Sequence, residues 1–143
     1  FYKDYKRNKK MLQEFKKFEK TCTEEYDAVF STFGPLGSLF CGMYYKKKHP
    51  DTKWICDFRD PAIAMSHGWL RNVYTRCYEK KACQCADEIV AVSNGYLKRI
   101  CGDKHKEKRH MIPNGYDEDD FAFSGNVTAS EGFLDLVYVL FQL

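Results

Sequence analysis

Hydrophobic and polar residues alternate along the chain in two patterns, one typical of helices and one typical of buried strands. Apolar side chains recur every three or four positions in residues 5–22 and 69–85, which predicts two amphipathic helices. Four short apolar runs, each bounded by turn-forming residues, predict strands at 27–31, 54–56, 88–93 and 110–112. Further helices are predicted for 36–45, which runs into three lysines, and for 94–101, between a Ser93 cap and Gly102.

These elements follow one another as strand, helix, strand, helix, strand, helix, strand. This alternation is typical of a parallel sheet joined by right-handed crossovers. The strands are nearly continuously apolar, as expected where both faces of a sheet are covered. The sequence therefore predicts an α/β fold: a Rossmann-like parallel sheet with helices on both faces.

Composition and charge narrow the class of protein. With 143 residues, 44% hydrophobic and 30% charged, the chain suits one globular domain. It has no apolar stretch long enough to span a bilayer. Seven cysteines without any CxxC pair predict reduced thiols in a cytoplasmic protein, and no metal site. The first predicted helix has a basic outer face, which indicates a solvated surface, or attraction to a polyanionic ligand or to anionic lipid such as that of the inner face of a cell membrane.

Polar residues follow every predicted strand. In open α/β sheets, ligands bind outside the carboxyl ends of the strands, which here carry Ser31, Thr32, Asp57, Arg59, Asp60, Ser93 and Asn114. Two carboxylates beside a guanidinium can supply a general base and an anion clamp, as group transfer from a phosphorylated donor requires. We predict Asp57 or Asp60 as the base, with Arg59 orienting phosphate or acceptor. The alternative is that Arg59 pairs with these acids only to hold a loop.

Weaker candidates line the same edge. Ser31, Thr32, Ser93 and Asn114 are predicted to bind substrate, although a helix cap is the simpler role for Ser93. His67, in the loop after Asp60, is the histidine best placed to carry a proton. No organic cofactor and no metal are predicted.

Four stretches together carry a resemblance to a known family: "YDAVFSTFGP", "WICDFRDP", "CADEIVAVSNGYLKRI" and "HMIPNGYDEDDF". Their order and spacing resemble the N-terminal half of family-four-like glycosyltransferases with the GT-B fold, over residues 24–121. The resemblance implies transfer of a sugar from a nucleotide-sugar to a glycan or lipid-linked acceptor, without a metal. It also implies that this chain is the acceptor-side part of such an enzyme, and that polysaccharide biosynthesis is the setting.

The resemblance also implies a domain organisation. Residues 1–121 correspond to the glycosyltransferase N-terminal Rossmann-like domain, incomplete at its start, and 122–143 to a linker and the first strand of a second domain. The family's glycine-rich loop and its acidic donor-site motif are not found in the sequence. We therefore expect a chain truncated at both ends and inactive alone.

Two other classes compete with this interpretation. A Rossmann-type nucleotide-binding domain requires GxGxxG after the first strand, where this chain has "GPLG". A truncated, non-catalytic binding module would suit the acidic and then apolar residues 117–143. Nucleic acid is not an expected partner, because the basic helix lacks interleaved aromatics outside its apolar stripe.

Overall fold

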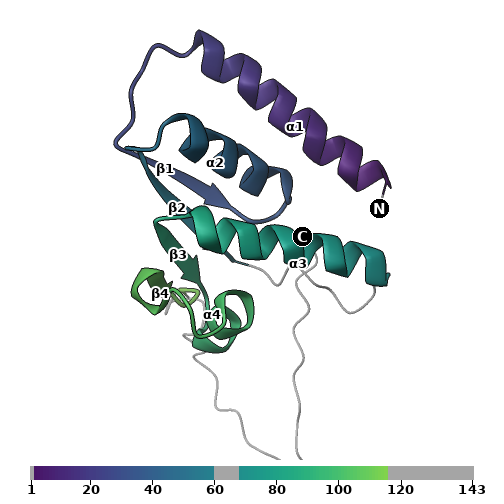
Figure 1. Cartoon of the computed structure of the whole chain (residues 1–143), viewed down its shortest axis with the longest axis vertical. Coiled ribbons are helices and arrows are strands. Elements are labelled where there is room, and N and C mark those ends of the chain that lie inside the picture. The colour runs from purple at the N-terminus through teal and green to yellow at the C-terminus, as the bar shows by residue number, and fades with distance from the viewer. Residues whose placement is uncertain (1, 60–67, 116–143) are drawn as a thin grey trace, which may run out of the picture.

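The computed structural model describes residues 2–59 and 68–115 of the chain. The described part contains one sheet of four parallel strands in the order β1-β2-β3-β4, with helices beside it (Figure 1). The α/β class and the Rossmann-like parallel sheet are thus confirmed. The strands are β1 (Ala28–Thr32), β2 (Lys53–Phe58), β3 (Glu88–Ala91) and β4 (Arg109–Met111); the α-helices are α1 (Tyr2–Thr21), α2 (Gly37–Lys48), α3 (Trp69–Cys85) and α4 (Asn94–Cys101).

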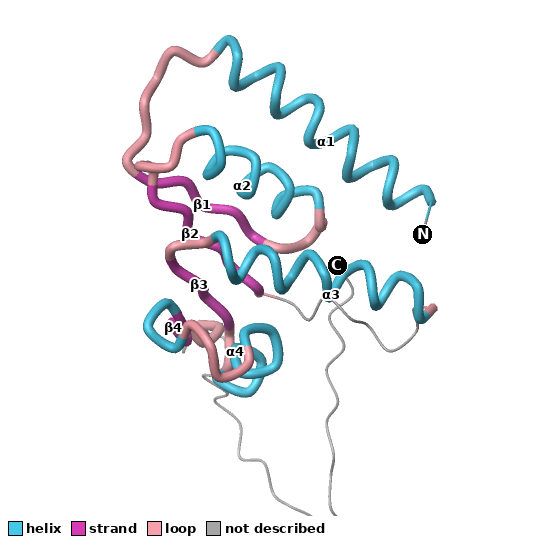
Figure 2. Tube along the Cα trace, in the orientation of Figure 1, coloured by secondary structure: helices cyan, strands magenta, loops and turns pink. Residues whose placement is uncertain are grey.

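The four described α-helices gather on one side of the sheet (Figure 2). Each strand lies beside the next in chain order, so right-handed crossovers place all three connecting helices over the same face. Under them Trp54, Cys56 and Phe58 are completely buried, whereas Phe30 on the alternate face is 61% exposed. Helices over this second face, which we also predicted, are not among the described elements. We call it the open face.

Helix α2 approaches the sheet closely where Gly42 lies against Trp54 of β2. A methyl group on Gly42 would collide with the Trp54 indole ring. The indole Nε1 donates a hydrogen bond to Ser31 Oγ in β1, over 2.9 Å. Trp54 therefore fixes both the height of α2 above the sheet and the pairing of the first two strands.

A second fixed point lies at the amino ends of the strands. Asp87, just before β3, accepts a 2.7 Å hydrogen bond from the Trp54 amide and pairs with Lys46 at 2.7 Å. Partial burial would raise the pKa of Asp87, but the bonds from Lys46 and the Trp54 amide lower it below its ordinary value. Lys46 also donates to the carbonyls of Pro50 and Thr52. One ion pair thus joins α2, its following turn and two strands.

Helix α1 forms an outer layer, with α2 between it and the strands (Figure 1). Its inward side matches the predicted stripe only in part. Leu12 and Phe15 are partly buried as predicted, but Phe18 is 60% exposed, and the two most buried residues are polar, Asn8 and Glu19. The reason is that hydrogen bonds from α2 to these two side chains set the rotation of α1.

Element boundaries agree with the patterns within a few residues. The predicted helix 36–45 extends to Lys48, so the three lysines at 46–48 are beyond the expected end and still helical. Ser93 caps α4 as predicted, its Oγ accepting from the Tyr96 amide at 3.2 Å, and Gly102 ends that helix with a φ of 62°. The domain boundary proposed at residue 121 and the segment 122–143 lie outside the described residues.

Replacing Gly42 with alanine is expected to destabilise the fold by about 1–3 kcal/mol, because the new methyl group must displace the buried Trp54 ring. The matched control is Gly95→Ala in α4, where a methyl group meets no atom within 4 Å. The free energy of unfolding of Gly95→Ala should stay within about 1 kcal/mol of the wild-type value. Urea unfolding followed by tryptophan fluorescence measures both. Equal stability of the two variants would contradict the proposed contact.

Candidate functional site

The carboxyl ends of the four strands meet at one edge of the sheet. Thr32 of β1 lies opposite Asp57 of β2, Phe58 lies opposite Ala91, and Ala91 lies opposite Met111 of β4. The polar residues that follow each strand consequently share this edge, as their predicted role requires. We call it the carboxyl edge.

Two of the predicted residues lie side by side on it. Asp57 alternates with the buried Cys56 and Phe58, so its side chain is directed to the open face. Thr32 is its register partner in β1, on the same face and exposed. Arg59 follows directly after β2 and is exposed. A carboxylate, a hydroxyl and a guanidinium are thus carried by neighbouring backbone positions where β1 and β2 end.

The other predicted residues have different surroundings. Ser31 points toward the helices and accepts the Trp54 indole hydrogen bond, which gives it a packing role. Ser93 is exposed at the edge while its hydroxyl caps α4. Asn114 is exposed beyond β4. Asp60 and His67 lie outside the described residues, so their predicted roles remain predictions.

Chemically, this edge can accept a proton at a carboxylate and hold an anion at a guanidinium. Within residues 2–59 and 68–115, no three His, Cys, Asp or Glu side chains come together in a way that could hold a metal ion. Cys77 and Cys85 of α3 are exposed while Cys83 is buried, so these neighbouring thiols do not converge.

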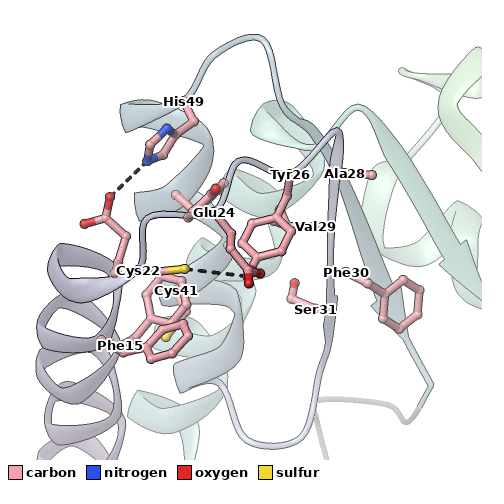
Figure 3. Close-up of a pocket in the computed structure, with 14 residues that line it drawn as sticks. Phe15, Cys22, Glu24, Tyr26, Ala28, Val29, Phe30, Ser31, Cys41 and His49 are labelled. Carbon is pink, nitrogen blue, oxygen red and sulfur yellow. Dashed lines mark hydrogen bonds and ion pairs between the residues drawn. The ribbon is translucent and has the colours of Figure 1, made fainter.

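A separate apolar pocket of about 280 Å³ lies where the end of α1 approaches β1 and α2 (Figure 3). Most of its lining side chains are aromatic or small, and Tyr26 is one of them (Figure 3). The Tyr26 hydroxyl donates to Glu24 at 2.8 Å and lies 3.6 Å from the Cys22 sulfur. The lining residues include Phe15, Phe18, Ala28, Val29, Phe30, Cys41 and Tyr45.

The rim of this pocket carries a polar cluster centred on Glu19. Its carboxylate accepts from Lys48 at 2.5 and 2.7 Å and pairs with His49 Nε2 at 3.0 Å. The hydrogen bond from Lys48, reinforced by His49, lowers the pKa of Glu19 below its ordinary value of 4.5. Because Lys48 and His49 end α2, the cluster locks the last turn of α1 onto the last turn of α2.

The sequence patterns did not identify the Glu19 cluster or the pocket. Glu19 occurs among lysines in a basic helix, where a solvated role is usual. The spacing of the residues could have pointed to Glu19. Asn8, Leu12, Phe15 and Glu19 share one helical face, so two polar residues interrupt the apolar stripe of this helix. Partners 29 and 30 residues away could not be read from that spacing.

Comparisons of the chain with protein-family models, with curated protein sequences and with solved structures find no match. Among the described helices, none combines the length and apolar character needed to cross a membrane.

Glu19→Gln is expected to lower stability near neutral pH and to flatten its decline in acid. Because folding depresses the pKa of Glu19, its contribution is present above pH 4.5 and is lost as the pH falls through the depressed value. Urea midpoints measured from about pH 7 to about pH 3 test this. Glu14→Gln, on the same helix but paired only with exposed Lys17, should keep the wild-type pH profile. Parallel profiles for wild type and Glu19→Gln would refute the assignment.

Proposed function

We propose that this chain is the acceptor-side domain of a glycosyltransferase, which moves a sugar from a nucleotide-sugar to a glycan or lipid-linked acceptor. The observation that supports it best is the grouping of Thr32, Asp57 and Arg59 at the carboxyl edge of an all-parallel sheet. Ligands of open α/β sheets bind at this edge. The four-motif resemblance to family-four-like glycosyltransferases is the second support.

In this proposal Asp57 acts on the acceptor. Its carboxylate accepts the proton of the acceptor hydroxyl as that oxygen attacks the sugar's anomeric carbon. Thr32, opposite Asp57, supplies a hydroxyl that can orient the acceptor. Arg59 binds the negative charge that builds up on the leaving nucleoside diphosphate, or an anionic group of the acceptor. Each role uses a side chain at the exposed end of β1 or β2.

The outer surface of α1 supports a lipid-linked acceptor. Lys3, Lys10 and Lys20 are exposed on this helix, while Asn8 and Glu19 hold its other side against α2. A fixed basic surface attracts anionic headgroups, by about 1 kcal/mol for each lysine near the membrane. Peripheral contact with an anionic membrane would bring a lipid-linked acceptor to the same molecule.

Asp57→Asn is expected to reduce sugar transfer at least about 100-fold, because the amide cannot accept the hydroxyl proton. The assay uses the natural polypeptide that carries this sequence, with a panel of nucleotide-sugars and with glycan and polyprenyl-phosphate acceptors. It measures nucleoside diphosphate release and glycosylated product. The matched control is Asp51→Asn, an exposed aspartate in the turn before β2, at the opposite end of that strand. This control should keep wild-type turnover.

Two results would contradict the proposal. Full turnover in Asp57→Asn would remove the base assigned here. No transfer by the wild-type polypeptide with any donor or acceptor of the panel, from folded protein, would favour the non-catalytic binding module. In that case saturable binding of the acceptor alone, measured by calorimetry, should persist.

A further inference from the structure

Two cysteines from neighbouring helices, α3 and α4, are in contact. Cys83 is near the end of α3, and Cys101 is the last residue of α4. Their sulfur atoms are 3.0 Å apart and share a hydrogen bond, and both are free thiols. Cys83 is 2% exposed, whereas Cys101 is only partly buried. The pair therefore has one outer and one inner member.

The surroundings of the two thiols shift their pKa values in opposite directions. The hydrogen bond with Cys83 and the positive charge of Arg109 lower the pKa of Cys101, although burial opposes them. The same hydrogen bond and burial raise the pKa of Cys83. The outer sulfur is consequently the better nucleophile, because thiolate rather than thiol attacks. The inner sulfur is held within reach as a second attacking group.

A cavity of about 620 Å³ opens beside this pair and is lined by both cysteines. Cationic side chains outnumber acidic ones on its wall: Arg76, Lys80, Arg99 and Lys104 against Glu79 and Asp103. Glu79 also lines it and is 3% exposed, and its buried Oε1 has no hydrogen-bond partner. Arg99 Nη2 lies 3.8 Å from that oxygen, beyond hydrogen-bond reach. Arg99 is thus the cation paired with this buried carboxyl group at the cavity wall.

We propose that Cys83 and Cys101 are a reversible redox pair, oxidised to a disulfide by a small peptide disulfide of the glutathione type that binds in this cavity. The carboxylates of such a molecule match the arginine and lysine side chains. The ligand chemistry that fits this cavity is therefore a small-molecule disulfide that carries carboxylate groups.

The exchange balances in two steps. The Cys101 thiolate attacks one sulfur of the bound disulfide, forms a mixed disulfide and expels one small thiolate, which takes up the proton that Cys101 released. Cys83 then loses its proton and attacks the Cys101 sulfur, which expels the second small thiolate to be protonated in turn. Two protein thiols become one disulfide, and one small disulfide becomes two small thiols.

Oxidation would connect α3 to α4 covalently. The two sulfurs need to approach by about 1 Å to reach the disulfide length of about 2.05 Å. The bridge would restrict the unfolded chain between residues 83 and 101, which includes β3 and the Ser93 cap. This inference is independent of the proposed transferase, because no residue of the carboxyl edge takes part.

The first test uses a chain in which the two exposed thiols are removed, Cys77→Ser/Cys85→Ser. Incubation with glutathione disulfide is expected to consume two thiols per chain and to yield a peptide cross-linked through Cys83 and Cys101, detected by mass spectrometry. Oxidation should raise the melting temperature by about 10 °C, and a reduced thiol should reverse it. Cys83→Ser in this background should retain one glutathione on Cys101. Cys101→Ser should take up none.

The second test separates the bound ligand from simple thiol reactivity. Lys80→Gln/Lys104→Gln changes two exposed lysines and should slow oxidation by glutathione disulfide about three- to tenfold. Oxidation by uncharged 2-hydroxyethyl disulfide should be unaffected. Equal rates with the charged reagent would overturn the binding site. A folded wild-type chain that leaves Cys83 and Cys101 reduced, or that accumulates unresolved glutathione on Cys101, would overturn the redox pair.

Discussion

The contact between Trp54 and Gly42 is the constraint on which the rest of the described structure depends. An indole ring and a helix backbone lie so close that only glycine fits between them. The helix layer is therefore set at a fixed height, under which Cys56 and Phe58 are closed off from water. Strand β2 is central and pairs with both β1 and β3. Fixing the position of Trp54 in β2 therefore also fixes where β1 and β3 end relative to β2. The shared carboxyl edge follows from that register.

Polar contacts at both ends of α2 orient α1 on the outside of the apolar core. The backbone amide of Gly37 donates to Asn8 of α1, which serves as a helix cap supplied from another element, and Glu19 holds Lys48 and His49 at the other end. A buried polar atom without a partner costs more than a neutral hydrogen bond contributes, so these contacts specify orientation more than they add stability. They explain why α1 turns a phenylalanine, Phe18, outward.

The sequence predicted the elements well because their signals are local. Apolar spacing, the Ser93 cap and Gly102 are each visible within one turn or strand, and they located all four helices and strands to within a few residues. The site was predicted only as a common edge, since parallel strands all point the same way, whereas the register that places Thr32 opposite Asp57 could not be read from the sequence. The Glu19 cluster and the Cys83–Cys101 contact were beyond prediction, because tertiary packing alone joins residues so far apart in the chain.

The layered position of α1 has a consequence for motion. Its polar and aromatic partners are helices, with Asn8 and Glu19 bound to α2 and Tyr5 in edge contact with Tyr74 of α3. Leu12 packs against the core, whose buried residues come from the sheet, the other helices and the loops beside them. The outer helix can therefore detach as a cooperative unit while the inner layers stay folded. Backbone amides of α1 would then exchange with deuterium through this partial opening, and those of β2 only through global unfolding.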